Sequence, residues 1–137
     1  LTGNGDNIIG YFFTSIKGFS KIGSYTGNGS ASNNSYVYTG FKPAFVMVKR
    51  TNGIGNWWLA DNKRNDVVGG NDIQKVLFPN LSSAEATDSA GYFDFFSNGF
   101  RVLSSSSELG GSGDSYIYIA FAENPLVGTN NIPATAR

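Results

Sequence analysis

Short runs of β-branched and aromatic residues alternate along most of the chain with clusters of Gly, Asn, Ser and Pro. Such runs predict β-strands, because these side chains suit a pleated surface, and the polar clusters between them suit turns. We expect strands over residues 7–15, 21–26, 35–39, 44–51, 56–61, 91–96, 99–104 and 115–122. In 44–51 both alternating sets of side chains are apolar until the end, which predicts a central strand that is covered on both faces.

Two connections stand out between these strands. Ser97, Asn98 and Gly99 separate Phe96 from Phe100, and Asn-Gly tolerates the positive φ angles of a tight turn, so a hairpin is expected here. The segment 63–90 breaks the strand rhythm because it is long and polar. It could hold a short helix near 73–77 or 82–86, and a segment of this length is expected to pack as an excursion over one edge.

The composition agrees with an all-β fold. Glycine is abundant, with 18 residues in 137, and aromatics reach 15%, whereas helices favour Ala, Leu, Glu and Lys. The length suits one domain. We therefore predict an antiparallel β-sandwich, jelly-roll-like in character, with the 63–90 segment as a long excursion.

A Gly-x-Gly-Asp turn followed by an aromatic strand occurs twice. Gly3 to Asp6 precedes residues 7–13, and Gly111 to Asp114 precedes residues 115–121, an offset of 108 residues (114 − 6). The two stretches either belong to a tandem array or share turn chemistry by chance. Residues 1–17 are accordingly interpreted as the closing strand of a preceding repeat or as the first strand of this sandwich, which leaves 18–137 as the β-sandwich domain.

Several classes of chemistry lack the residues that they need. The chain has no Cys and no His, which excludes thiol catalysis, Ser-His triads and the usual zinc or haem sites. Its formal net charge is zero without a basic stripe, so no nucleic-acid partner is expected. No run approaches the roughly 20 apolar residues of a membrane helix. We therefore predict no catalytic residues, no metal, no cofactor and no membrane partner, and we read the chain, which starts without Met, as a fragment or processed segment.

The dipeptide Trp57-Trp58 is the most informative candidate for binding. Adjacent strand residues point to opposite faces, so one indole can fill the core while the other faces outward. An outward Trp beside polar residues could stack on a sugar ring, or it could pack against another sheet, loop or subunit. The candidate ligand-binding residues are Trp57, Trp58, Asp61, Asn62, Lys63 and Arg64.

Carboxylates that could form a glycosidase pair are Asp61, Asp66, Asp72, Asp94, Glu108 and Glu123. Sequence alone places no two of them across a cleft. Asp94 interrupts an aromatic strand and requires a partner, and Arg101 or Arg64 could form a structural ion pair with it.

Six stretches carry further motifs, namely residues 18–30, 38–50, 55–58, 61–64, 95–100 and 116–125. Through them, essentially all of 18–137 resembles a repeat domain of phage tail-fibre-like proteins. This resemblance implies tandem β-sandwich domains in a multimeric fibre, towards the C-terminus of virion surface proteins and often beside laminin-G-like lectin modules. Residues 133–137 also resemble the natural C-terminus of such a protein.

The function expected from this resemblance is structural and adhesive. We expect a non-catalytic domain on the virion that contacts other virion subunits, as a homo-oligomer for which a trimer is one arrangement, and that binds a host-surface glycan. The alternatives are a polysaccharide depolymerase domain and a capsid decoration protein.

Overall fold

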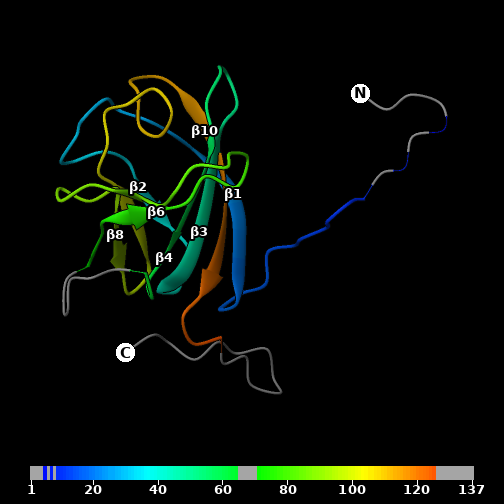
Figure 1. The fold of residues 1–137 in the computed structure, drawn as a ribbon. Coiled ribbons are helices and arrows are strands. Elements are labelled where there is room, and N and C mark those ends of the chain that lie inside the picture. Colours follow the sequence, from blue (N-terminus) through cyan, green and yellow to red (C-terminus); the bar gives the residue numbers. More distant parts are fainter. Residues whose placement is uncertain (1–4, 6, 8, 65–70, 126–137) are drawn as a thin grey trace.

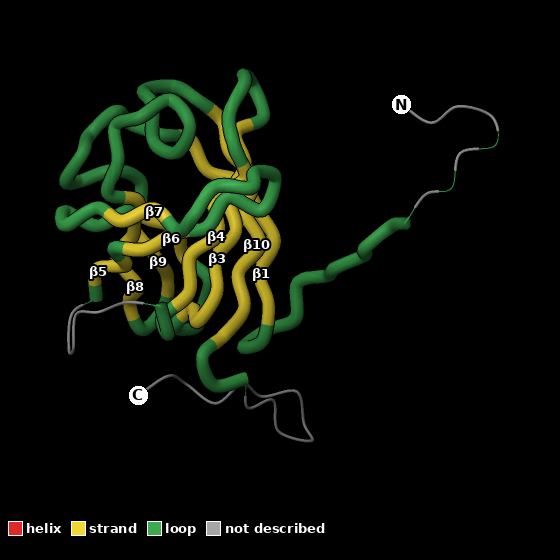
Figure 2. Tube along the Cα trace, viewed as in Figure 1, coloured by secondary structure: helices red, strands yellow, loops and turns green. Residues whose placement is uncertain are grey.

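The computed structural model describes residues 5, 7, 9–64 and 71–125, and every strand pairing in this part of the chain is antiparallel. One sheet has the order β1-β10-β3-β4, and a second has the order β2-β9-β8-β5. A two-stranded sheet of β6 and β7 lies beside β4 (Figure 1). No helix occurs in the described residues (Figure 2). The predicted all-β sandwich is confirmed.

The strand bounds follow the sequence prediction closely for most of the chain. They are β1 (Ser20–Thr26), β2 (Tyr36–Tyr38), β3 (Pro43–Arg50), β4 (Trp57–Asp61), β5 (Asp72–Ile73), β6 (Lys75–Val76), β7 (Ala86–Thr87), β8 (Phe93–Phe96), β9 (Gly99–Val102) and β10 (Ser115–Ala122). The expected central position of 44–51 is confirmed, since β3 pairs with β10 on one side and β4 on the other.

The core lies between the two four-stranded sheets and is rich in aromatic rings. The first sheet contributes Tyr116 and Tyr118 from β10, and Tyr25 stacks on Tyr116 with ring centroids 4.8 Å apart. The second sheet contributes Phe93, Phe95 and Phe100, all at most 2% exposed. Because side chains alternate across each strand, these inward residues leave their sequence neighbours on the two outer faces.

The 97–99 hairpin is confirmed with a shifted register. Phe96 pairs with Gly99, so the two-residue connection is Ser97 and Asn98, and Gly99 begins β9. Gly99 is needed for space, because a Cβ at this position would overlap the carbonyl oxygen of Val37 on the neighbouring strand β2. The hairpin thus brings β2, β9 and β8 together closely.

The excursion contains short strands rather than the helix that we expected near 73–77 or 82–86. Asp72 and Ile73 pair with β8, while Lys75 and Val76 pair with β7. Leu59 and Leu77 exchange backbone hydrogen bonds of 2.9 Å, which attaches the excursion to β4. Backbone N–H and C=O groups of the excursion thus form hydrogen bonds with neighbouring strands. This tertiary pairing overrides the local helical preference. Gly69 and Gly70 lie outside the described residues.

The predicted strand over 7–15 is wrong for the described part of that range. Residues 7 and 9–15 form no strand, and the segment extends away from the sandwich beside β1 (Figures 1 and 2). At its base, the Oγ atom of Ser15 accepts a hydrogen bond of 3.0 Å from the backbone N–H of Ile22. Ile16 forms an isolated bridge with Ser20 through a turn at Gly18, whose φ is +74°. We call the described residues 7 and 9–15 the arm.

Candidate functional site

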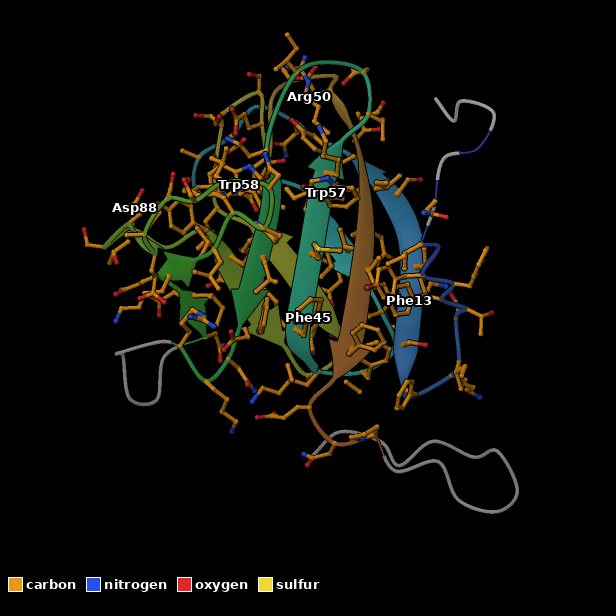
Figure 3. All side chains as sticks on the ribbon, turned by 45° about the vertical axis from the view of Figure 1, so that its right-hand side comes forward. Phe13, Phe45, Arg50, Trp57, Trp58 and Asp88 are labelled. Carbon is orange, nitrogen blue, oxygen red and sulfur yellow. The ribbon has the colours of Figure 1, made fainter. Side chains whose placement is uncertain are left out.

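The two tryptophans point to opposite sides of β4, as the alternation predicts (Figure 3). Trp58 is only 8% exposed and packs edge-on against Phe78, with ring centroids 4.7 Å apart. It therefore belongs to the core and offers no surface for a sugar, which corrects its place among the binding candidates. Trp57 lies half-buried on the outer face, and its backbone N–H donates a hydrogen bond of 2.9 Å to Oδ1 of Asn80.

We call the six candidate residues, Trp57, Trp58, Asp61, Asn62, Lys63 and Arg64, the tryptophan patch. Most of its polar members bind one another or the adjoining chain. Arg64 donates to Asp61 over 2.8 Å and to Glu85 over 3.1 Å, and these two hydrogen bonds raise the pKa of its guanidinium. The amide of Asn62 donates to Glu123 over 2.8 Å. These bonds connect the end of β4 to the excursion and to the end of β10, so they favour a structural role. Lys63 is exposed.

The outer face of the first sheet is apolar, and sequence reasoning did not single it out. Successive rows across its strands place Ile22, Ile119, Met47 and Leu59 side by side, and then Ile117 beside Lys49 and Trp57. Phe121 and Phe45 are partners in the row below, with ring centroids 5.7 Å apart. In the sequence, both alternating sets of side chains are apolar in 44–51 and 115–122, and this pattern could have revealed the face. For 44–51, we interpreted the pattern as a strand covered on both faces.

The base of the arm already touches this face. Phe13 and Phe19 both pack edge-on against Phe121, at centroid distances of 5.9 and 6.0 Å. Ile117 remains exposed, and the other apolar members of the face are half-buried. We call Ile22, Phe45, Met47, Trp57, Leu59, Ile117, Ile119 and Phe121 the outer apolar face.

Among the described residues, the candidate acids are dispersed except for one pair. Asp72 and Asp94 are cross-strand partners on the outward side of the second sheet. Asp94 lies opposite Arg101, as expected, yet no ion pair forms between them in the described chain. Arg101 instead lies over the ring of Phe96 at 5.3 Å. Burial, partly offset by Arg101 and reinforced by Asp72, raises the pKa of Asp94.

The other candidate acids have structural contacts. Glu108 accepts hydrogen bonds from Asn56, and Glu123 pairs with Lys42 at 2.8 Å. Asp66 and Asp6 lie outside the described residues. Asp114 pairs with Arg50 at 2.6 Å, which ties the turn before β10 to the end of β3. No group of three or more acidic residues able to hold a metal ion occurs in the described part of the chain.

The described residues thus define an all-β sandwich domain with an apolar outer sheet face and an aromatic arm. The chain belongs to the family described as a domain of unknown function (DUF7483), whose profile matches residues 1–125, the arm included. No curated protein and no solved structure gives a significant match. Among the described residues, no helix has the length and apolar character to span a membrane.

Proposed function

We propose that this chain is a non-catalytic structural and adhesion domain of a phage fibre or another virion surface protein. The resemblance of residues 18–137 to repeats of tail-fibre-like proteins suggests the setting. The structural part of the proposal is assembly with other virion subunits or with copies of the same fold. The observation that supports it is the outer apolar face.

The outer apolar face is unusual for a sheet that faces solvent. An antiparallel sheet with one face on the core ordinarily presents polar side chains on the other. Here the three rows carry eight apolar side chains. The charged groups among them are Lys49, which lies beside Trp57, and Asp61, which ends the row of Phe45 and Phe121. A contiguous apolar patch of this kind marks a surface that becomes buried in an assembly.

The arm supports the same proposal. Phe12 is 95% exposed, and Ile9 and Tyr11 are also largely exposed, which is costly for side chains of this size in water. The arm repeats the pattern of β10, and the equivalent glycines Gly5 and Gly113 both have positive φ angles, +96° and +76°. In the proposed assembly the arm supplies the β10 strand of a preceding copy of the fold, which buries its aromatic residues.

Association of the full chain tests the assembly proposal. Ile119 lies in the middle of the outer apolar face, half-buried between Ile22 and Met47. We expect the wild-type chain to self-associate in light scattering with increasing concentration, and Ile119→Lys to shift it towards monomer while far-UV circular dichroism stays unchanged. Ile54→Lys is the matched control, because Ile54 is fully exposed in the β3–β4 loop and outside the face. A wild-type chain that stays monomeric at all concentrations, or equal effects of both variants, would contradict the proposal.

The alternatives predict different observations. A depolymerase requires two facing carboxylates at a cleft. Asp72 and Asp94, which adjoin each other in the described residues, lie on an outward sheet face. Release of reducing ends from a polysaccharide that stops in Asp94→Asn would favour this alternative. A capsid decoration protein would bind assembled capsids through the outer apolar face rather than associate with copies of itself.

A further inference from the structure

A pocket of about 360 Å³ lies between the start of β1 and the end of β2, away from the tryptophan patch. Its lining includes Ser15, Lys17, Ser20, Lys21, Tyr38 and Thr39, with Gly18 and Gly40 at the turns. Its volume falls in the range of small-ligand sites. None of the residues discussed so far as a binding candidate contributes to it, and none of the carboxylates in the described residues lines it.

Tyr38 is an exposed ring that lines the pocket. Val37 points into the core, so its neighbours Tyr36 and Tyr38 both point outward from β2. The ring of Tyr38 lies near Gly40, where an added Cβ would lie 3.6 Å from the Tyr38 hydroxyl and 3.8 Å from two ring carbons. Tyr38 is 64% exposed. An aromatic ring that is open to solvent can stack against the C–H groups of a sugar.

Lys17 and Lys21 give the pocket a positive charge. Both side chains are exposed, and neither has an acidic partner in the described part of the chain. An anion that enters the pocket can therefore be bound by either ammonium group. The chain as a whole is electrically neutral, so this positive charge is a local property of the pocket.

A second ring extends the surface along β2. Tyr36 is 44% exposed and lies two residues before Tyr38 on the same side of the strand, which corresponds to roughly 7 Å along the strand. Its hydroxyl donates to Oδ1 of Asn98, and its ring packs near Phe96 with centroids 5.8 Å apart. These contacts fix Tyr36 in place, and Tyr36 extends the aromatic surface beyond Tyr38, which lines the pocket.

We propose that this pocket binds an acidic saccharide, such as a uronic acid residue within a longer glycan. Tyr38 stacks on the sugar ring, and Lys17 and Lys21 bind its carboxylate. Tyr36 contacts the next sugar of the chain. The proposal names a site for the adhesive part of the function and does not depend on assembly through the outer apolar face.

Titration of the full chain with two oligosaccharides of equal length tests the site. The probes are tetragalacturonate, which is acidic, and maltotetraose, which is neutral. We expect saturable binding of tetragalacturonate by isothermal calorimetry, weakened by added salt because charged groups contribute. Tyr38→Ala should weaken it about tenfold, as expected for loss of roughly 1.4 kcal/mol. Tyr38→Phe should bind normally, because stacking needs the ring and not the hydroxyl.

Charge variants separate the roles within the pocket. The double variant Lys17→Gln with Lys21→Gln should lose the preference for the acidic probe. Lys42→Gln is the matched control, because Lys42 does not line the pocket and its side chain, 38% exposed, pairs with Glu123. Circular dichroism spectra identical to wild type establish that each variant is folded.

Three results would overturn the proposal. They are an absence of saturable binding to either probe, binding that survives Tyr38→Ala unchanged, and equal affinity for inorganic phosphate, which would indicate an anion site without a sugar contact. Repeating the titration with the Ile119→Lys variant distinguishes this proposal from assembly, since Ile119 lies outside the pocket and binding should not change.

Discussion

Replacement of Asn34 should uncouple the loops at one end of the sandwich. The Asn34 side chain is 3% exposed and lies between the β1–β2 loop and the β9–β10 loop. Its Oδ1 atom accepts hydrogen bonds from backbone N–H groups, and its Nδ2 atom donates to backbone carbonyl oxygens. The partners are Asn28 (3.0 Å) and Ser35 (2.7 Å) for Oδ1, and Ser30 (3.0 Å), Ser104 (2.6 Å) and Gly110 (2.7 Å) for Nδ2.

The cost of losing these bonds can be worked out from the number of backbone groups left without a partner. Each buried polar group that loses its partner costs about 1–3 kcal/mol, and water entering at the rim recovers part of the total. We therefore expect Asn34→Ala to lower the free energy of unfolding by about 3 kcal/mol. With a urea dependence of about 1.5 kcal/mol per molar, the unfolding midpoint should fall by about 2 M.

Asn34→Asp provides a second readout through pH. The substitution keeps the shape but turns a carboxylate towards three carbonyl oxygens, which raises the pKa of that carboxyl in the folded protein above its unfolded value. The folded state then binds the proton more tightly than the unfolded state. Stability is therefore highest below the unfolded pKa and is lost as pH rises through the folded pKa.

Urea unfolding followed by tryptophan fluorescence, at neutral pH and in mild acid, measures both effects. Asn33→Asp is the control, because Asn33 is exposed and its side chain has no hydrogen bond in the described structure. The reasoning is refuted if Asn34→Asp is as stable as Asn33→Asp at neutral pH, or if acid destabilises it relative to that control.

Two further predictions concern the second sheet. The raised pKa of Asp94 means that its charged form is disfavoured in the folded state. Asp94→Asn should therefore be more stable than wild type at neutral pH, and this gain should disappear in acid, where Asp94 is protonated. Urea unfolding midpoints at both pH values test this. Gly99→Ala should lower the free energy of unfolding by about 2 kcal/mol, because its Cβ would overlap the Val37 carbonyl oxygen and lie 2.6 Å from the Tyr36 hydroxyl. Gly55→Ala is the control in thermal unfolding, since its Cβ would meet the nearest atom at an ordinary 3.4 Å, and equal losses in the two variants would contradict the prediction.

The sequence predicted most strands because their side-chain alternation is a local property. The β3 residues Phe45 to Val48 illustrate this, since two apolar sets in one strand indicated its central position. The strands at Asp72 and Lys75 are only two residues long, and the sheet edges that they meet determine their pairing, so no local pattern could reveal them.

The candidate site was predictable only in part, for the same reason. Alternation correctly separated Trp57 from Trp58, although it could not show which of the two would face the core. The alternation of Tyr36, Val37 and Tyr38 was a local signal for two outward rings, and sequence reasoning overlooked it. The placement of Tyr38 in one pocket with Lys17 and Lys21 depends on the tertiary arrangement of β1 and β2.

The position of β10 has a consequence for how the chain reaches its folded state. Among the described strands β10 comes last in sequence, and it pairs with β1 on one side and with β3 on the other, so it joins the first of these strands to the third. Until Ser115–Ala122 is available, Ser20–Thr26 has no strand partner and β3 exposes one edge. Because the contacts that complete this sheet span most of the sequence, loop closure makes folding slow, and nascent chains present open strand edges during synthesis.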